Sequence, residues 1–332
     1  MLAAVSGATG FIGSAVVRKL LADGRPVRAL VEPGANPRNL DALVLGGGGV
    51  ERVTVDVCDF DGMKRALAGC ATYYHLAAIY RVWNPDPRAI YRVNVEGTTT
   101  SLLAAQAAGV GRVVYTSSIA AVGLRADGRP ADETVPFNTH DIANEYLLTK
   151  MLGERIALGF ARVLPVVVVN PAFPFGPGDV APTPTGAIVL AILRGQLPAV
   201  GAGGFCAVDV DDVAAGHVAA EWRGRVGERY ILGNHNVTFR DFATLVAKTA
   251  GVRPPSVQIP TWLGLGIAHG MELWSTHVSH RTPRATAKSV AYLERRAFFD
   301  NAKARRELGL PETPLQASVE RSVAWFQKQG MV

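Results

Sequence analysis

The chain has 332 residues, of which 48% are hydrophobic, and this length predicts about two structural units around a sizeable core. The formal net charge is +6, but the basic residues are scattered and no aromatic platform accompanies them, which argues against nucleic-acid binding. Cys58, Cys70 and Cys206 match no zinc or redox spacing, so we expect free thiols and no metal. The first residues lack the pattern of a secretory signal, which favours a cytoplasmic protein.

Short β-rich runs alternate with helical patterns through the first 170 residues. Strands are predicted at residues 3–6, 26–31, 53–57, 72–76, 112–116 and 164–169. Helices are predicted at residues 11–22, 61–68, 89–108 and 142–161. This alternation predicts a Rossmann-type, doubly wound α/β fold, with a parallel sheet covered by helices on both faces.

After Pro171 the pattern changes to Pro- and Gly-rich sequence followed by apolar helices. Helices are predicted at 187–194, 213–222 and 315–328, and a strand at 229–232. We expect residues 1–170 to form a dinucleotide-binding domain to which residues 205–233 return. Residues 171–204 and 234–332 are expected to form a smaller, mostly helical substrate-binding part.

One apolar stretch, residues 257–274, needs a separate interpretation. It contains Pro260, His269 and Glu272 and falls short of a membrane-spanning segment, so no integral membrane segment is expected. We expect a helix over the substrate pocket or against a neighbour, and peripheral contact with lipid stays open.

A glycine-rich segment follows the first predicted strand and opens the first helix, with Gly7, Gly10 and Gly13 in the spacing G-x-x-G-x-x-G. Such glycines permit a tight turn, close approach of a pyrophosphate, and close packing of helix on strand. The helix N-terminus then offers free N–H groups to phosphates. The segment therefore predicts a dinucleotide site.

The residue after the second strand usually distinguishes the two nicotinamide dinucleotides. Glu32 stands there, and a carboxylate favours the ribose hydroxyls of NAD over the phosphate of NADP. Arg38 lies six residues further on and offers an alternative phosphate contact. Asp56 and Val57, predicted to end the third strand, suit an adenine contact. We therefore expect NAD or NADP, with NAD slightly favoured.

Tyr146 and Lys150 lie four residues apart in a predicted helix, so both side chains share one face. An ammonium near a phenol favours the phenolate, which would let Tyr146 exchange protons with a carbonyl or alcohol oxygen. The fifth strand ends in Ser117 and Ser118, at the sheet edge where ligands gather. We expect Ser118, with Ser117 in reserve, to polarise the substrate oxygen.

These motifs together resemble the extended short-chain dehydrogenase/reductases. The motifs are GATGFIG at 7–13, DV at 56–57, HLAA at 75–78, NVEGT at 94–98, YTSS at 115–118, YLLTK at 146–150 and NPAFPFGPGD at 170–179. The chain looks most like the dihydroflavonol-4-reductase-like branch. Within it, residues 80–87, 125–133 and 182–186 look like bacterial hopanoid-associated sugar epimerases.

The resemblance implies a catalytic set of Ser118, Tyr146 and Lys150. It also implies a cofactor site that adds Thr9, Phe11, Ile12, Leu76, Ala77, Ala78, Pro171 and Phe173 to Gly7, Gly10, Gly13, Glu32, Arg38, Asp56, Val57, Tyr146 and Lys150. Two departures stand out. Reductases of this branch usually carry Arg where Glu32 stands, and the extended family often has His where Asp209 stands.

Several side chains are expected near the nicotinamide as substrate contacts, each with lid packing as an equal alternative. They are Tyr80, Trp83, Ser118, Asn144, Phe175 and Phe205. We favour a carbonyl reductase or alcohol dehydrogenase with a mostly apolar small-molecule substrate. The alternative is a nucleotide-sugar epimerase or dehydratase with tightly bound NAD, whose phosphates Arg281, Arg284, Arg295 and Arg296 would bind. A homodimer through helices 89–108 and 142–161 is expected by analogy with the fold.

Overall fold

The computed structural model describes residues 1–332 except 46–48, 81–85, 198, 256, 280–282 and 284. A seven-stranded parallel sheet has the order β10-β6-β5-β4-β1-β2-β3. Its strands are β1 (Ala3–Ser6), β2 (Val27–Val31), β3 (Val50–Thr54), β4 (Thr72–His75), β5 (Arg112–Thr116), β6 (Val166–Pro171) and β10 (Arg229–Leu232). The strand order reverses between β1 and β4, which is where doubly wound folds bind ligands.

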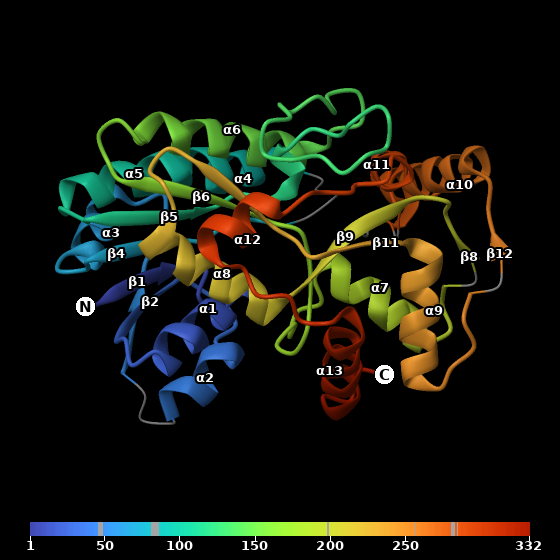
Figure 1. The fold of residues 1–332 in the computed structure, drawn as a ribbon, viewed down its shortest axis with the longest axis horizontal. Coiled ribbons are helices and arrows are strands. Elements are labelled where there is room, and N and C mark those ends of the chain that lie inside the picture. The colour runs from blue at the N-terminus through green and yellow to red at the C-terminus, as the bar shows by residue number, and fades with distance from the viewer. Residues whose placement is uncertain (46–48, 81–85, 198, 256, 280–282, 284) are drawn as a thin grey trace.

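Helices cover both faces of this sheet (Figure 1). One face carries α3 (Phe60–Leu67), α5 (Gly97–Ala107) and α6 (Glu145–Phe160), while the other carries α1 (Phe11–Ala22), α2 (Arg38–Leu45) and α8 (Val210–Arg223). Helix α5 continues from α4 (Pro87–Tyr91) through a π-helical turn, Arg92–Glu96. Helix α12 (Ala302–Leu308) packs beside α8.

Alternation along the strands divides the core into two layers. In β5 and β6, Val113 and Val168 pack toward one set of helices, whereas Val114 and Val169 pack toward the other. All four side chains are fully buried. A strand that is buried on both faces reads as an unbroken β-branched run, as VVVV does in β6.

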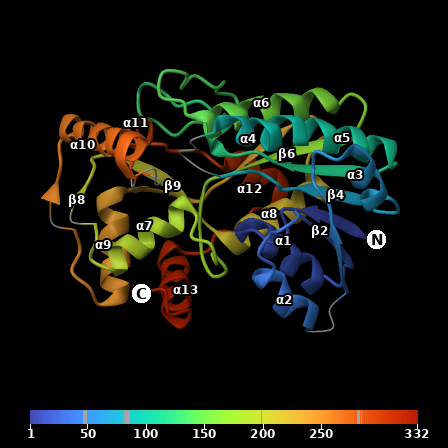
Figure 2. The ribbon, with the colours of Figure 1, turned by 180° about the vertical axis from the view of Figure 1, so that it is seen from behind.

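The rest of the chain forms a second layered unit beside the sheet (Figure 2). Its strands are β7 (Phe173–Phe175), β9 (Gly204–Asp209) and β11 (His235–Thr238), in the order β11-β9-β7, and the short pair β8 (Ala199–Val200) and β12 (Val257–Gln258). Its helices are α7 (Pro184–Leu193), α9 (Phe239–Ala250), α10 (Thr261–Trp274), α11 (Ala287–Glu294) and α13 (Leu315–Lys328). Phe175, Phe205, Phe242 and Phe326 are fully buried in its core.

The predicted Rossmann-type fold is confirmed, but three details differ. The third strand is Val50–Thr54 rather than 53–57, because its ladder runs from Val27↔Val50 to Val31↔Thr54. Asp56 and Val57 therefore follow the strand instead of ending it. The second unit is mostly helical, as predicted, but it also contains the unpredicted β11-β9-β7 sheet. Of the segment expected to return to the first domain, α8 and β10 pack with the large sheet, whereas β9 does not.

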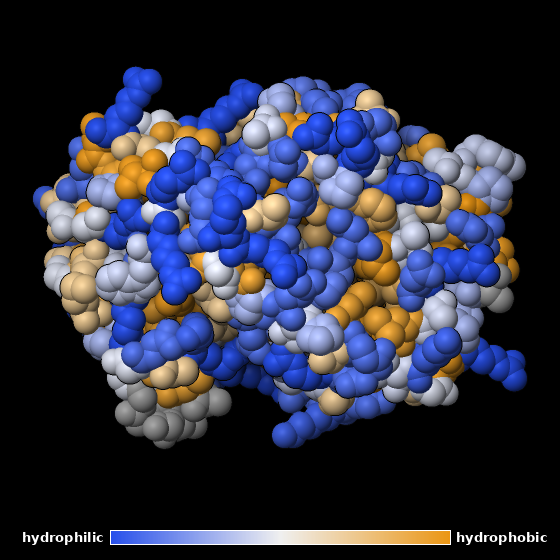
Figure 3. Space-filling view, viewed as in Figure 1, coloured by the Kyte–Doolittle hydropathy of each residue, from blue (hydrophilic) through white to orange (hydrophobic). Residues whose placement is uncertain are grey.

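Hydrophilic side chains cover most of the face seen in Figure 3, with small apolar patches among them. Among the described residues, no helix is long and apolar enough to span a membrane. The same part of the chain contains no group of three or more His, Cys, Asp or Glu side chains arranged to hold a metal ion.

Candidate active site

Helix α6 positions the predicted tyrosine and lysine. Asn144 caps its N-terminus by accepting a hydrogen bond from Leu147 N at 3.0 Å, which places Tyr146 in the first turn. Lys150 follows one turn later and is buried. The helix therefore presents both side chains on one face, as their spacing predicts.

The carboxyl end of β5 brings Ser118 to the same place. Its side chain lies close enough to the Tyr146 phenol to lower the pKa of that phenol, and it accepts a hydrogen bond from Ala120 N at 3.1 Å. Asn170 at the end of β6 donates to the Ser118 carbonyl oxygen at 2.9 Å, which fixes the backbone beneath it. Ser117 is instead buried, and its hydroxyl has no partner among the described residues. The geometry therefore favours Ser118 over Ser117.

The phenol of Tyr146 is harder to ionise than its neighbours led us to expect. Burial raises its pKa to about 12, and the nearby Ser118 hydroxyl offsets only part of that rise. The Lys150 ammonium donates to the main-chain oxygen of Thr116 at 3.0 Å. Lys150 is not among the groups that lower this pKa, contrary to expectation, so burial dominates and the protein alone keeps Tyr146 protonated at neutral pH.

Lys150 is itself perturbed. Burial lowers the pKa of its ammonium to about 8, and the Glu154 carboxylate one turn further along α6 acts against that shift. Glu154 is buried and is held by Arg229 Nη1 at 2.6 Å and by Asn170 Nδ2 at 2.5 Å. The lysine consequently keeps its charge through a carboxylate that other buried groups hold in place.

Two buried histidines also lie near Lys150 and remain neutral. Burial, followed by the lysine charge, lowers the pKa of His75 to about 3. Burial likewise lowers the pKa of His217 to about 4, with Lys150 again contributing. His217 Nδ1 lies 2.8 Å from the Val213 carbonyl oxygen and its Nε2 lies 2.9 Å from Thr116 Oγ1. His217 therefore donates to Val213 and accepts from Thr116.

The glycine-rich turn has the close packing that its spacing predicts. Gly7 adopts φ +66°, and a Cβ there would lie 2.8 Å from the Leu76 backbone. A Cβ on Gly13 would lie 2.0 Å from the Gly7 carbonyl oxygen. Only glycine fits at these two positions without a shift of backbone. The turn therefore brings β1, α1 and the segment after β4 into direct contact.

The N-terminus of α1 fits a dinucleotide phosphate. It begins at Phe11 after Gly10, without a side-chain cap and without an acidic residue in its first turn. Such an end offers N–H groups and a partial positive charge to an anion. Asn39, which the sequence analysis missed, donates to both Thr9 O and Gly178 O at 3.0 Å. It ties the turn to the loop after β7, and nothing in its local sequence signals that role.

The remaining predicted cofactor residues lie along the same sheet edge. Half-buried Ile12 is in the first turn of α1, and half-buried Leu76, Ala77 and Ala78 follow β4. Pro171 ends β6 and Phe173 begins β7. The carboxyl ends of β1, β4 and β6 therefore converge on one face, as a doubly wound sheet requires.

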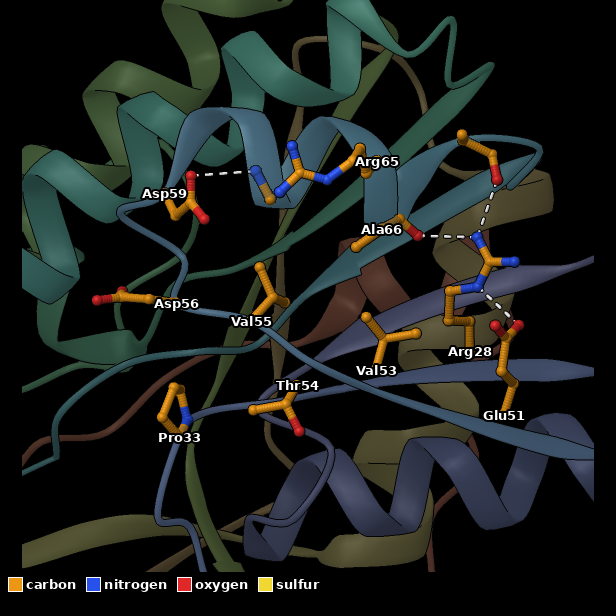
Figure 4. A pocket seen from close by; sticks show the side chains of 12 residues that line it. Arg28, Pro33, Glu51, Val53, Thr54, Val55, Asp56, Asp59, Arg65 and Ala66 are labelled. Atoms are coloured by element: carbon orange, nitrogen blue, oxygen red, sulfur yellow. Dashed lines mark hydrogen bonds and ion pairs between the residues drawn. The ribbon is translucent and has the colours of Figure 1, made fainter.

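The residues expected at the adenosine end are more open. Glu32 and Arg38 are both exposed, and Arg38 donates to Gln329 at 2.6 Å. Asp56 pairs with Arg92 at 2.6 Å. Asp56 also lines a groove of about 600 Å³ between β3 and α3, shown in Figure 4. None of the catalytic candidates lines this groove, so it is distinct from the catalytic site.

Aromatic side chains surround Tyr146. The Tyr80 ring lies 4.6 Å from the Tyr146 ring, centroid to centroid. Tyr292 of α11 is buried close enough for Tyr146 to raise its pKa further after burial, and its hydroxyl has no partner among the described residues. Tyr292 was missed, because 146 residues of sequence separate it from Tyr146. These rings make the surroundings of the phenol largely apolar.

The structure places two other predicted substrate residues, Phe205 and Phe175, in the core. Phe205 is fully buried between Phe173 and Phe242, with ring centroids at 5.0 and 5.1 Å, and Phe175 packs in the same cluster. Both are core side chains, because β7 and β9 pair with each other beneath α7 and α9. Asn144 caps α6 two residues before Tyr146, and its substrate contact stays a prediction. Trp83, Arg281 and Arg284 lie outside the described residues.

Comparison with known proteins agrees with this geometry. The profile of the NAD dependent epimerase/dehydratase family matches residues 3–233. The chain belongs to this family. It is 38% identical to a "Putative dihydroflavonol 4-reductase" of Synechocystis, over 99% of this chain and 95% of that protein. It is 35% identical to "Sterol demethylase protein B" of Methylococcus capsulatus, over the full length of both.

Among solved structures, the dTDP-glucose 4,6-dehydratase DesIV of Streptomyces venezuelae, with NAD and TYD bound, superimposes with a TM-score of 0.81. It shares 26% identity over 100% of this chain and 98% of that one. The chain is therefore an extended short-chain dehydrogenase/reductase of the dihydroflavonol-4-reductase-like branch, in a family that uses NAD. The finer likeness to hopanoid-associated proteins stays a prediction.

Proposed function

We propose that the protein is an NAD(P)-dependent oxidoreductase that reduces a ketone or aldehyde, or oxidises the corresponding alcohol. The observation that carries the proposal is the placement of the Ser118 hydroxyl beside the Tyr146 phenol at the carboxyl edge of the sheet, with Lys150 one helical turn away. These are the groups that proton transfer to a carbonyl oxygen requires.

The proposed mechanism assigns one task to each side chain. NAD(P)H, when bound, supplies the hydride for the carbonyl carbon. Ser118 donates a hydrogen bond to the carbonyl oxygen, and Tyr146 Oη gives that oxygen its proton. Burial keeps the phenol protonated until then, since it raises the pKa of Tyr146 to about 12. Lys150, still cationic below its pKa of about 8, stabilises the phenolate that remains.

The open N-terminus of α1 and the glycine-rich turn would hold the cofactor's pyrophosphate. Glu32 favours NADH because a carboxylate repels the additional phosphate of NADPH, although exposed Arg38 lies nearby in the sequence. A comparison of kcat/KM for NADH and NADPH measures this preference. A higher value for NADPH would contradict the role given to Glu32.

We infer that the substrate is mostly apolar or aromatic, because Tyr80 and Tyr292 surround the catalytic phenol. The names of relatives, which include a dihydroflavonol reductase and a sterol demethylase protein, agree with that class. The alternative is a nucleotide-sugar epimerase or dehydratase, favoured by the likeness to DesIV. Arg295, one of the cations it would need, instead pairs with Asp141.

The two functions differ in whether the cofactor is consumed. Purified protein is incubated with NADH or NADPH and a panel that includes a dihydroflavonol, a sterol ketone and simple aldehydes. We expect consumption of reduced cofactor in a 1:1 ratio with alcohol formed, by the stoichiometry of hydride transfer. Protein that carries tightly bound NAD and interconverts sugar nucleotides without net oxidation would overturn the proposal.

A further inference from the structure

Helix α10 presents its largest apolar side chains to solvent rather than to the core. Trp262 is 73% exposed, Trp274 63% and Leu273 62%. Successive side chains are turned by 100° about the helix axis, so the direction of Trp262 and the direction of Met271 lie 180° apart and bound one half of the helix surface. The residues in this half are Trp262, Leu273, Gly266, Gly270, Leu263, Trp274, Ile267 and Met271, and all of them are exposed.

The two buried residues of α10 are both small. Gly264 and Ala268 are buried, and a Cβ on Gly264 would meet Val290 of α11 and Ile259. An ordinary surface helix has the opposite arrangement, with its large apolar residues toward the core. Large apolar side chains held together in water mark a surface that another apolar phase covers.

The position of α10 leaves this face accessible. Figures 1 and 2 both place α10 at the outer end of the molecule, away from the seven-stranded sheet and the N-terminus. It packs on α11, which carries Tyr292 beside the catalytic Tyr146. With 14 residues, α10 is about 21 Å long and too short to cross a bilayer, but it can lie along its surface.

The charge of the surrounding chain indicates what covers the face. Residues 251–296 contain six Lys and Arg against two Glu, a net charge of +4, which falls to +3 once Asp141, the partner of Arg295, is counted. Glu294 accepts hydrogen bonds from Thr261 and Ala202, and Glu272 accepts one from Ala287 N. Exposed cations in this segment include Arg253 and Lys288. Such a segment attracts an anionic surface.

We propose that α10 docks the enzyme on the surface of a membrane that contains anionic lipids. The outward half of α10 enters the boundary between headgroups and acyl chains, with Trp262 and Trp274 near its two ends. The nearby cations interact with the headgroups. A second copy of the chain is a poorer occupant, because two surfaces of net positive charge repel each other.

Docking would place α11, and therefore the apolar surroundings of Tyr146, next to the lipid phase. An apolar substrate that partitions into membranes would then reach the site without crossing water. This consequence rests on the proposed function, whereas the docking itself does not.

The test is flotation with vesicles of phosphatidylcholine, with and without phosphatidylglycerol. Wild-type protein is expected to float with the vesicles that contain phosphatidylglycerol and to be released by high salt. The double variant Trp262→Ser/Trp274→Ser should bind at least about tenfold more weakly, since each substitution removes an apolar side chain that would be buried in the membrane. Trp222→Ser is the matched control, because Trp222 is 58% exposed on α8, outside the patch.

Two further measurements are made on the same proteins. Thermal melting detects a folding defect, and ketone reduction in lipid-free buffer tests the proposed reaction independently of membrane binding. Equal flotation of the double variant and the wild type would overturn the proposal. Failure of the wild type to bind either vesicle would also overturn it. So would light scattering in which the wild type and Trp222→Ser are dimers and the double variant is a monomer, because the outward half of α10 would then be a dimer interface.

Discussion

At the scale of single residues, charge balance around Lys150 determines how the site titrates. The buried ammonium lies among neutral His75 and His217, and Glu154 is the carboxylate that supports its charge. Asn170 and Arg229 hold that carboxylate, and Asn170 also holds the backbone of Ser118. We therefore propose that Glu154 is a positioning residue that acts on the reaction through Lys150.

Replacement of Glu154 tests this role. Glu154→Gln keeps the size of the side chain but removes the charge that raises the pKa of Lys150, so that pKa should fall below about 8. Lys150 then loses its proton at lower pH, and the basic limb of the pH profile of kcat/KM should move to lower pH.

The matched control is Glu145→Gln, which removes a carboxylate from the first turn of the same helix. It should leave the basic limb in place. An unchanged limb in a well-folded Glu154→Gln protein would show that Glu154 does not act through Lys150. Thermal melting of each variant separates the charge effect from loss of structure.

At the scale of elements, local patterns predicted the helices best. The apolar periodicity at 11–22 and 315–328 gave α1 and α13 with the bounds that the structure has. The strands β7, β9 and β11 were not predicted, because their pairing is non-local and Phe173-Pro174-Phe175 contains a proline. The periodicity of apolar residues in a short segment does not show which distant strand that segment pairs with, and it does not identify a three-residue strand that contains a proline.

The same distinction applies to the site. The positions of Tyr146 and Lys150 follow from a helix, and that of Ser118 follows from a strand end, so the sequence was sufficient for them. Asn39 and Tyr292 reach the site only through tertiary packing, which the pattern around them does not indicate. Phe205 was assigned to the substrate because it is aromatic, whereas its place in the core follows from β9 pairing with β7 and β11.

The glycine-rich turn yields a prediction for one element. In Gly13→Ala the new Cβ would lie 2.0 Å from the Gly7 carbonyl oxygen, so the turn must move. We expect a loss of about 1–3 kcal/mol in the free energy of unfolding and much weaker binding of NADH. Denaturant unfolding and fluorescence titration with NADH measure these two effects.

Gly159→Ala is the matched control, since Gly159 lies in α6 and its Cβ would meet nothing within 4 Å. It should stabilise the protein by about 0.5–1 kcal/mol and leave NADH binding unchanged. Tight NADH binding by Gly13→Ala would contradict the assignment of the turn to the cofactor.

At the scale of the whole molecule, the buried histidines link stability to pH. In the unfolded chain a histidine takes up its proton near pH 6.5, whereas folding lowers the pKa of His75 to about 3 and that of His217 to about 4. Their contribution to stability is therefore complete above pH 6.5 and is lost progressively as the pH falls toward these lower values.

We expect the melting temperature to fall between pH 6.5 and pH 4, and the fall to be shallower in His217→Gln, which has one buried histidine fewer. The exposed His269→Gln is the control and should keep the slope of the wild type. A slope that is the same in all three proteins would show that the buried histidines are not its cause.

Oligomeric state belongs to the same scale. The homodimer expected through helices 89–108 and 142–161 stays a prediction, and it involves a different face from the outward half of α10. Light scattering gives the oligomeric state of the wild type and of the α10 double variant. A dimer that persists in the double variant does not depend on the outward half of α10.

The central claim is that Tyr146 transfers the proton in a hydride-transfer reaction, and Tyr146→Phe tests it most directly. The substitution removes only the hydroxyl, so the fold and the glycine-rich turn should remain intact. We predict that turnover of the carbonyl substrate falls by about 10²- to 10⁴-fold, while the Kd for NADH stays nearly the same. Unchanged turnover in a folded, cofactor-binding Tyr146→Phe protein would contradict the account.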